Sequence, residues 1–266
     1  MKVAVIQTSS LPYEKAKINY FLSILRSKNV KLVLIGEYVL NLFFKELEKT
    51  PINFIKKQSS HQLKLFKKLS NSYDMTIIAP IVIVKDKKIY KAFVKFSPKS
   101  TRFYYQQLFM PYSHWNEKNF FSKKDNKPMV FKIEGFTIGI LPGFETHFDE
   151  FWQFFRKKRV DLVLVPSVGT FNSQKRWKQI LSTQAFLNNC YVLRANRVGS
   201  YKDWKFYGNS FLANPDGEII EELSNKEELL IANVDKKLVK TSRKEWGFDV
   251  REDLNPDIFK GYICKK

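Results

Sequence analysis

The carboxyl group of Glu37 is placed where it could transfer protons. Glu37 comes directly after the apolar run KLVLIG at residues 31–36, which indicates a buried strand. Because a carboxyl group at a strand end is partly removed from water, its pKa rises toward the working pH, where it can accept and return protons. The alternative is a strand-end glutamate that points into solvent. A partly buried carboxyl group at this position suits proton transfer.

Thiol chemistry has two candidates, Cys190 and Cys264, and neither has the surroundings of a reactive group. Cys190 opens the apolar run CYVLRANRV at residues 190–198, where a buried, inert thiol is expected, and Cys264 lies beside the final two lysines. Neither cysteine belongs to a CxxC motif or to a Cys/His cluster with metal-site spacing. The sequence therefore predicts reduced thiols, no disulfide, no metal site and no cofactor.

Apolar runs alternate with amphipathic stretches, and these elements must position the candidate residues. Strands are predicted at 3–7, 31–36, 75–84, 88–97, 101–109, 136–141, 161–167, 190–198 and 228–235. Helices are predicted, from apolar residues at helical spacing, at 12–28, 54–72, 148–158 and 174–188. Polar residues 85–88 and the turn Pro215-Asp216-Gly217 indicate two hairpins. Since no long linker or internal repeat interrupts the pattern, we expect one α/β domain over residues 1–266.

Net charge is the most unusual bulk property of the chain. The 46 Lys and Arg residues against 26 Asp and Glu residues give a formal charge of +20, which attracts polyanions and acidic substrates. The lysines are scattered in pairs, without a dense basic tail or an RNP-type aromatic motif, so a solvated surface is favoured over a nucleic-acid site. No window approaches the roughly 20 apolar residues of a membrane span, and MKVAVIQ is not a signal-peptide core. We expect a cytoplasmic protein without membrane contact.

Five segments resemble the nitrilase, or carbon-nitrogen hydrolase, superfamily. They are IGEYVLN (35–41), NEKNFFSKKD (116–125), FTIGILPGFETHFDEFW (136–152), VDLVLVPS (160–167) with the helix and NNCYVLRANRVG (188–199) after it, and YGNSFLANPDGEII (207–220). Each segment alone is weak evidence, but five in the family order cover nearly the whole chain. The resemblance implies a four-layer α-β-β-α sandwich, often assembled into homodimers or larger homo-oligomers.

The resemblance also implies a reaction that needs three groups. A thiolate attacks the carbonyl or nitrile carbon, a glutamate transfers protons, and a lysine stabilises the oxyanion. Glu37 matches the glutamate, with Gly36 in place of the usual preceding proline, and Glu117 falls on a second glutamate of the family. The lysine is missing: counting from Leu108 places Tyr105 at its position, and counting back from Glu117 places Gln106 there. Neither residue is cationic, so oxyanion stabilisation should be weaker.

Gly143 occupies the position of the family's nucleophilic cysteine. The family's Cys-aromatic-acid sequence falls on Gly143-Phe144-Glu145, and glycine has no side chain that could attack a substrate. Loss of a covalent nucleophile from groups that act as a unit costs on the order of 10⁶ in rate. We therefore expect no thiol-dependent amidase reaction.

Residues close to these positions are candidates for the wall of a pocket. They are Trp115, Phe144, Glu145, His147 and Trp177. Together with Glu37 and Glu117, the Glu145 and His147 side chains could hold a metal ion or activate water in the space of the absent thiol. Since they show no recognised ligand spacing, we expect His147 to be a capping or surface residue instead.

Three functions are consistent with these residues. The first is a degenerate family member, a pseudoenzyme that keeps a pocket for a small amide, amine or carboxylate ligand, or for a protein partner. The second is an active C-N bond hydrolase that uses water activated by Glu37 and Glu117. The third is a basic scaffold for an acidic partner, with nucleic acid less favoured. The first is preferred because two of the three parts of the family reaction are absent.

Overall fold

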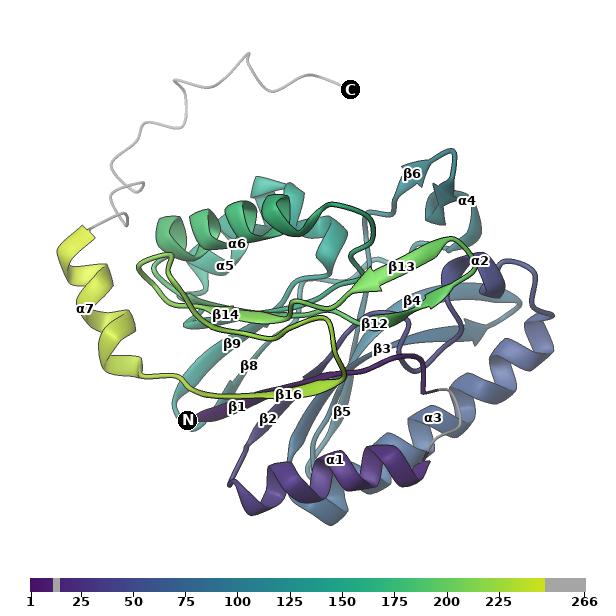
Figure 1. The fold of residues 1–266 in the computed structure, drawn as a ribbon, viewed down its shortest axis with the longest axis horizontal. Helices are drawn as coiled ribbons and strands as arrows, with labels where there is room; N and C mark the ends of the chain where they lie inside the picture. Colours follow the sequence, from purple (N-terminus) through teal and green to yellow (C-terminus); the bar gives the residue numbers. More distant parts are fainter. Residues whose placement is uncertain (12–14, 247–266) are drawn as a thin grey trace.

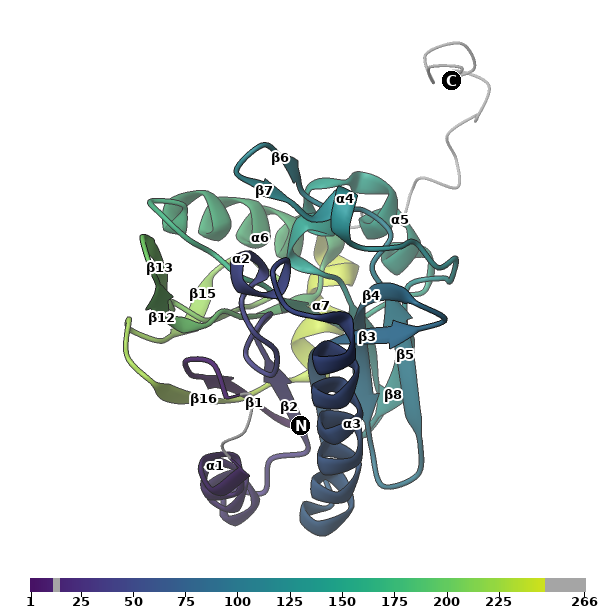
Figure 2. The same cartoon turned by 90° about the vertical axis from the view of Figure 1, so that its right-hand side faces the viewer.

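The computed structural model describes residues 1–11 and 15–246, which form an α-β-β-α sandwich (Figure 1). Two sheets of six strands each make up the middle layers of this part of the chain. Figure 2 shows α1 (Lys15–Ser27) and α3 (Ile52–Tyr73) outside one sheet, and α5 (Asp149–Lys157) and α6 (Gln174–Asn188) outside the other. The predicted α/β fold with four layers is confirmed.

The first sheet has the strand order β16-β1-β2-β3-β4-β5. Its strands are β1 (Lys2–Gln7), β2 (Leu32–Ile35), β3 (Thr76–Lys85), β4 (Lys88–Phe96), β5 (Thr101–Tyr105) and β16 (Glu228–Asn233). β1, β2 and β3 are parallel, whereas β4, β5 and β16 pair antiparallel. The turn between β3 and β4 places Asp86 and Lys87 at φ values of 51° and 59°. Two consecutive positive φ values give the twist that a two-residue hairpin loop requires.

The second sheet follows the same plan, in the order β15-β14-β11-β10-β9-β8. Its strands are β8 (Val130–Ile133), β9 (Phe136–Ile140), β10 (Leu162–Pro166), β11 (Tyr191–Ala195), β14 (Phe211–Ala213) and β15 (Ile219–Glu222). β9, β10 and β11 are parallel, and antiparallel strands flank them. Each sheet therefore has three parallel strands at its centre.

The core is divided by the alternation of side chains along each strand. Val3 packs in the cluster between the two sheets, whereas its neighbour Ala4 packs in the cluster beneath α1 and α3. Leu164 likewise packs between the sheets, and its neighbour Val163 packs with Trp152 beneath α5 and α6. Because both faces of the central strands are buried, these strands have continuous apolar sequences instead of alternating ones.

Short elements complete the described part of the chain. They are α2 (Phe44–Leu47), β6 (Pro111–Tyr112), β7 (Trp115–Asn116), α4 (Glu117–Phe120), the 3₁₀ helix η1 (Gly143–His147), β12 (Val198–Tyr201), β13 (Trp204–Tyr207) and α7 (Lys236–Trp246). The predicted strand at 190–198 is wrong at its end, because β11 stops at Ala195 and a separate hairpin begins at Val198. The predicted helix at 12–28 corresponds to α1, and its first three residues lie outside the described part. Among the described helices, none is long and apolar enough to cross a membrane.

Candidate ligand-binding site

The residues singled out in the sequence gather where the parallel strands of both sheets end. β2 leads into Glu37, β9 leads towards Gly143, and β10 leads into Ser167. The backbone N–H of Glu37 donates to the carbonyl oxygen of Ser167 at 3.0 Å, which joins the two sheets at this edge. Ligand sites of α/β sheets form at the carboxyl ends of the strands, because the loops that follow can converge there.

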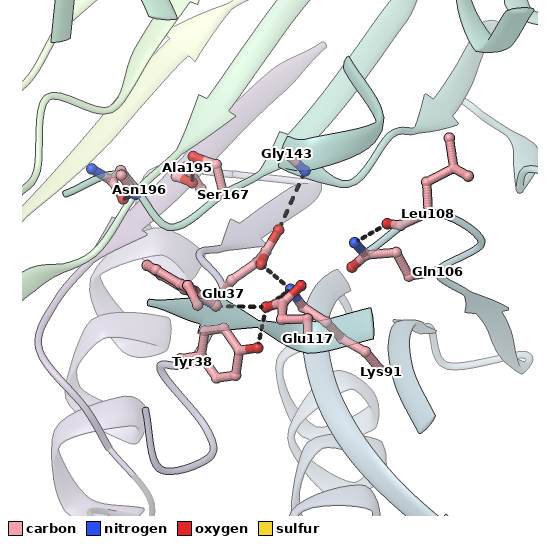
Figure 3. Close-up of polar contacts among 12 residues, drawn as sticks. Glu37, Tyr38, Lys91, Gln106, Leu108, Glu117, Gly143, Ser167, Ala195 and Asn196 are labelled. Carbon is pink, nitrogen blue, oxygen red and sulfur yellow. Dashed lines mark hydrogen bonds and ion pairs between the residues drawn. The ribbon is translucent and has the colours of Figure 1, made fainter. Parts of the chain in front are cut away.

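A buried ionic cluster joins Glu37 to Glu117 through Lys91, a residue of β4 (Figure 3). The Nζ of Lys91 lies 2.5 Å from Oε2 of Glu37 and 2.8 Å from Oε1 of Glu117. The hydroxyl group of Tyr38 and the indole N–H of Trp115 donate to the same Oε1 of Glu117. The side chains of Lys91, Glu37 and Glu117 are 3%, 2% and 0% exposed, so the cluster is shielded from solvent.

Burial and the charge of the ion-pair partner shift the pKa values of Glu37 and Lys91 in opposite directions. Burial raises the pKa of Glu37, the ammonium group of Lys91 limits the rise, and Glu117 adds to it. Burial alone would lower the pKa of Lys91, but the two carboxylates outweigh burial and hold the pKa above its ordinary value. Lys91 is therefore protonated at neutral pH. Its ammonium group faces two carboxyl groups, those of Glu37 and Glu117.

A cavity of about 230 Å³ opens in front of Glu37 and Gly143. Its wall is largely aromatic and also carries polar groups: Met110, Tyr112, His114, Trp115, Phe144, His147, Val168, Gly169, Thr170, Phe171, Ser173, Arg176 and Trp177. The structure thus places four of the candidate wall residues, Trp115, Phe144, His147 and Trp177, around one cavity. Pockets for drug-sized ligands begin at about 300 Å³, so this cavity suits a smaller molecule.

Gly143 borders the cavity at its floor, and Ser167 packs closely against it. Its backbone N–H donates to Oε1 of Glu37 at 3.3 Å. A Cβ atom added to Gly143 would lie 2.9 Å from the Cβ and 3.2 Å from the Cα of Ser167. Contacts this short require the backbone to move. The present geometry therefore suits glycine.

Glu145 is buried behind the cavity wall and supports the loop that follows β5. Its Oε1 accepts the backbone N–H groups of Gln107 at 2.6 Å and Leu108 at 3.1 Å, and its Oε2 accepts the hydroxyl group of Tyr104 at 2.7 Å. Burial raises the pKa of Glu145 to about 7 in spite of these hydrogen bonds. The contacts indicate a structural role for a residue that the sequence suggested for the pocket.

Gln106 and Tyr105, the two candidates for the missing lysine position, face different surroundings. Gln106 is buried, its backbone N–H donates to the carbonyl oxygen of Lys91 at 3.0 Å, and its Nε2 donates to the carbonyl oxygen of Leu108 at 2.6 Å. Tyr105 is half-buried, and its ring packs edge-on against Tyr90. Gln106 is therefore the candidate that lies next to the ionic cluster.

Lys91 is the site residue that the sequence analysis missed. The available signal was a lysine inside an apolar run predicted to be a strand, because a buried lysine needs a partner. Lys95 on the same strand shows why this signal is weak. It is also buried, but the partners of its Nζ are the hydroxyl groups of Ser97 and Ser100, each at 3.1 Å.

His147 and Cys190, the described candidates for metal and thiol chemistry, have the surroundings of packed side chains. Across residues 1–11 and 15–246, no group of three or more His, Cys, Asp or Glu side chains is arranged to hold a metal ion. The Nδ1 of His147 lies 3.1 Å from the carbonyl oxygen of Phe144, and its ring packs edge-on against Trp177. Cys190 is buried, and burial raises its pKa to about 12, as expected for an inert thiol. Cys264 lies outside the described residues.

A family model described as carbon-nitrogen hydrolase matches residues 2–244, so the chain belongs to this family. The chain is similar to N-carbamoylputrescine amidase of Arabidopsis thaliana, with 27% identity over 162 residues that make up 55% of this chain and 54% of the plant protein. A Staphylococcus lugdunensis protein named hydrolase in agr operon is 27% identical over 146 residues, 54% of this chain and 62% of that protein. The chain thus spans about half the length of the curated relatives that it matches.

Solved structures share the fold along nearly the whole chain. A carbon-nitrogen hydrolase from Helicobacter pylori G27 has a TM-score of 0.88 and 20% identity, with coverage of 100% of this chain and 99% of that one. A variant of the amidase from Nesterenkonia sp. AN1 has a TM-score of 0.77 and 17% identity, with coverage of 94% and 99%. At these identities the likeness shows the fold.

Proposed function

We propose that the chain is a degenerate carbon-nitrogen hydrolase that binds a small amide or amine in the cavity beside Glu37 and does not turn it over through a thioester. The observation that carries this proposal is the geometry at Gly143. Gly143 has no side chain that could attack a substrate, and a Cβ atom would lie 2.9 Å from the Cβ of Ser167. Covalent catalysis needs an activated nucleophile within reach of the substrate.

The hydrogen bonds of Glu37 support a ligand with an N–H group. Oε1 accepts the N–H of Gly143, and Oε2 accepts the ammonium group of Lys91. Each carboxylate oxygen has two lone pairs, so Glu37 can accept further donors from a ligand. Two carboxyl groups outnumber the one ammonium group of the cluster, so a carboxylate ligand is disfavoured beside Glu37 and would have to bind Arg176 in the cavity wall instead.

Water-dependent hydrolysis is the alternative use of the same cavity. Glu117 is fully buried, and its Oε1 already accepts Tyr38, Lys91 and Trp115. Activation of a water molecule would therefore fall to Glu37, which borders the cavity. The names of the curated relatives include amidases, so this reaction must be measured alongside binding.

The test measures binding and turnover in the same samples. Thermal unfolding is followed with acetamide, a short N-carbamoyl amine, n-butylamine and acetate, and ammonia release is assayed in parallel. We expect the amide or amine probes to raise the unfolding temperature without ammonia release, and the variant Glu37→Gln to remove most of the effect. Glu48→Gln, an exposed ion-pair partner of Lys45, is the control.

Each other outcome of that test contradicts the proposal. Ammonia release that Glu37→Gln abolishes would establish water-dependent hydrolysis. Stabilisation by acetate alone would move the ligand contact to Arg176. No stabilisation by any probe at millimolar concentration, together with no ammonia release, would refute a small-molecule role for the cavity.

Anion binding is a second candidate function, because a separate groove concentrates positive charge. The groove measures about 440 Å³ and is lined by Thr137, Arg159, Asp161, Lys236, Lys240, Arg243 and Lys244. Asp161 is the one acidic residue that borders it in the described part of the chain, and its oxygens lie 3.2 Å from Lys236 and 3.0 Å from Arg243. Of the cations, Lys236, Lys240, Arg243 and Lys244 all belong to α7, and these four against the one carboxylate leave positive charge for an acidic partner.

A salt titration separates this groove from the general charge of the protein. Binding of a labelled tripolyphosphate is measured between low and physiological salt, with the variant Lys240→Ala/Lys244→Ala and the control Lys56→Ala/Lys57→Ala on α3. We expect affinity that falls steeply with salt and is lost selectively in the groove variant. Equal losses in both variants would assign binding to the diffuse charge of +20.

A further inference from the structure

We propose that Lys91 is a relocated active-site cation: it lies directly across the sheet from Gln106 and takes the place of the lysine that is absent from residue 105 or 106. In this position it pairs with both Glu37 and Glu117 and fixes the Glu37 carboxyl group where it borders the cavity. Lys91 is thus a positioning residue. The inference rests on the proposed function, because it concerns how the same cavity presents its acceptor.

The strand register places Lys91 and Gln106 opposite each other. β4 and β5 pair antiparallel, with Ala92 opposite Tyr105. One step further, the N–H of Gln106 donates to the carbonyl oxygen of Lys91 at 3.0 Å. Directly opposed residues of antiparallel strands project from the same face, with Cβ atoms about 4.5–5.5 Å apart. A lysine at residue 91 and a lysine at residue 106 would therefore both place their ammonium group on the same face of the sheet, beside the same carboxylates.

A lysine at the position of Tyr105 would not lie on the same face as Lys91. Neighbouring residues of a strand project from opposite faces, so Tyr105 and Gln106 face different layers. The ring of Tyr105 packs against the core cluster beneath α1 and α3. The side chain of Gln106 is buried at the end of β5, beside the cluster shown in Figure 3. The geometry thus selects Gln106 as the partner of Lys91.

The contacts of Lys91 are those of a charge-balancing group. Its ammonium group touches both carboxylates, and its Nζ lies 4.8 Å from the centre of the Tyr38 ring. The same ammonium group lies 2.5 Å and 2.8 Å from the two carboxylates, so both are close to it. Without its charge, the repulsion between two buried carboxylates would raise the pKa of one of them. Lys95, also buried on β4, contacts only serine hydroxyl groups among the hydrogen bonds described for its Nζ, and the pKa of Lys95 is lowered, mainly by burial.

Two buried oxygen atoms of the described residues lack a hydrogen-bond partner, which agrees with a lysine position that differs between residues 106 and 91. Oε1 of Gln106 and Oε2 of Glu117 have no hydrogen-bond partner in the described part of the chain. A lysine side chain carries only donors, whereas the glutamine brings in the acceptor that stays unpaired. The Nε2 of Gln106 donates to the carbonyl oxygen of Leu108, a hydrogen bond that a lysine ammonium group can also donate.

The experiment compares the pH dependence of unfolding for four proteins: the wild type, Lys91→Met, the exchange variant Lys91→Gln/Gln106→Lys, and Lys95→Met as a matched buried-lysine control. Methionine keeps the volume of the side chain and removes its charge. In Lys91→Met the pKa of one carboxyl group should rise, so its stability is retained at low pH and lost as pH increases. We expect the unfolding equilibrium constant of Lys91→Met relative to wild type to be about tenfold or more larger at pH 8 than at pH 5.

The controls make the result decisive. The exchange variant should recover the wild-type pH profile, and Lys95→Met should shift stability equally at both pH values. A wild-type profile for Lys91→Met would assign Lys91 to packing, and an exchange variant that keeps the Lys91→Met profile would overturn the relocation. If Lys91→Met does not fold at any pH, folding of the exchange variant decides: success supports the relocation and failure overturns it. None of these readouts needs a ligand, so a failure of acetamide and amines to bind would refute the proposed function alone.

Discussion

The guanidinium group of Arg194 donates from Nε to the Oγ of Ser167 over 3.1 Å, behind the floor of the cavity. Its other nitrogens donate to the carbonyl oxygen of Asn209 and to the hydroxyl group of Tyr207, each at 3.2 Å. The Cζ of Arg194 also lies 4.9 Å from the centre of the Trp177 ring. This one side chain therefore connects the residue packed against Gly143 with the aromatic wall.

Replacement of Arg194 by lysine should be strongly destabilising. A lysine cannot reproduce the planar fork that donates in three directions, and its compact charge would be buried without equivalent partners. We expect the free energy of unfolding to fall by about 3–5 kcal/mol, measured by urea denaturation. The control is Arg102→Lys on the exposed part of β5, where a change within about 0.5 kcal/mol is expected. Similar losses at both positions would contradict the role given to Arg194.

Restoring a cysteine at residue 143 should destabilise the protein. The added Cβ atom would lie 2.9 Å from the Cβ of Ser167, so the backbone of η1 or of the loop after β10 must shift. We expect Gly143→Cys to lower the free energy of unfolding by about 1–3 kcal/mol, as overpacked cores do. Urea denaturation under reducing conditions measures the change.

A double-mutant cycle identifies the cause of that loss. Ser167→Gly removes the shorter contact, to Cβ, but also removes the hydroxyl group that donates to Ala195 and accepts from Arg194. We expect Gly143→Cys/Ser167→Gly to be more stable than the sum of the two single changes predicts, by about 0.5–3 kcal/mol. Simple additivity would show that the cysteine is accommodated without contact with Ser167.

The site was predictable where a residue follows a strong local pattern. Glu37 and Gly143 each come shortly after a short apolar strand, which places each at the carboxyl end of its own sheet; β2 and β9 belong to different sheets, so their contact depends on how the two sheets pack. Lys91 escaped prediction because its significance depends on Glu37 and Glu117, which lie far from it in the sequence. A lysine within KIYKAFVKF looks the same whether its partner is a carboxylate or solvent.

The fold shows the same limit. Helix α6 was predicted at its observed bounds, because its sequence between two turns has helical spacing. Helix α7 was missed because KKLVKTSRKEW is dominated by charge, and of its residues Val239 and Ser242 are buried. The loop and hairpin around the cavity were also missed, because short aromatic segments such as Trp204–Tyr207 take their structure from packing against neighbours more than from local pattern.

Removal of the Tyr38 hydroxyl group should weaken the ionic cluster. This group donates to Oε1 of Glu117, and the residue is 3% exposed. A hydrogen bond to a buried charged group contributes about 1.5–3 kcal/mol, so we expect Tyr38→Phe to lower the free energy of unfolding by that amount. Tyr20→Phe serves as the control, since Tyr20 is 63% exposed. Equal stability of Tyr38→Phe and wild type would mean that Lys91 and Trp115 alone satisfy the carboxylate.

Glu145 should make stability fall as pH rises from about 4.5 to about 7. Burial raises the pKa of Glu145 from 4.5 to about 7, so the folded protein binds this proton more tightly than the unfolded chain does. Its contribution is therefore fully present below about pH 4.5 and is lost as pH passes through the folded pKa. The variant Glu145→Gln keeps the shape and cannot titrate. At about 1.4 kcal/mol per pKa unit, wild type should lose roughly 3 kcal/mol relative to Glu145→Gln across this range.

Urea denaturation at pH 4.5, 6 and 7.5 measures the Glu145 effect, and Glu227 supplies a control of opposite sign. Burial would raise the pKa of Glu227, but hydrogen bonds from Lys17, Ser9 and Thr8 outweigh it and lower the pKa to about 2. Its contribution is present above pH 4.5 and is lost only as pH falls toward 2, so the difference between wild type and Glu227→Gln should stay constant across the three pH values. A constant difference for Glu145→Gln as well would show that the three donors around Glu145 keep its carboxylate ionised in the folded protein.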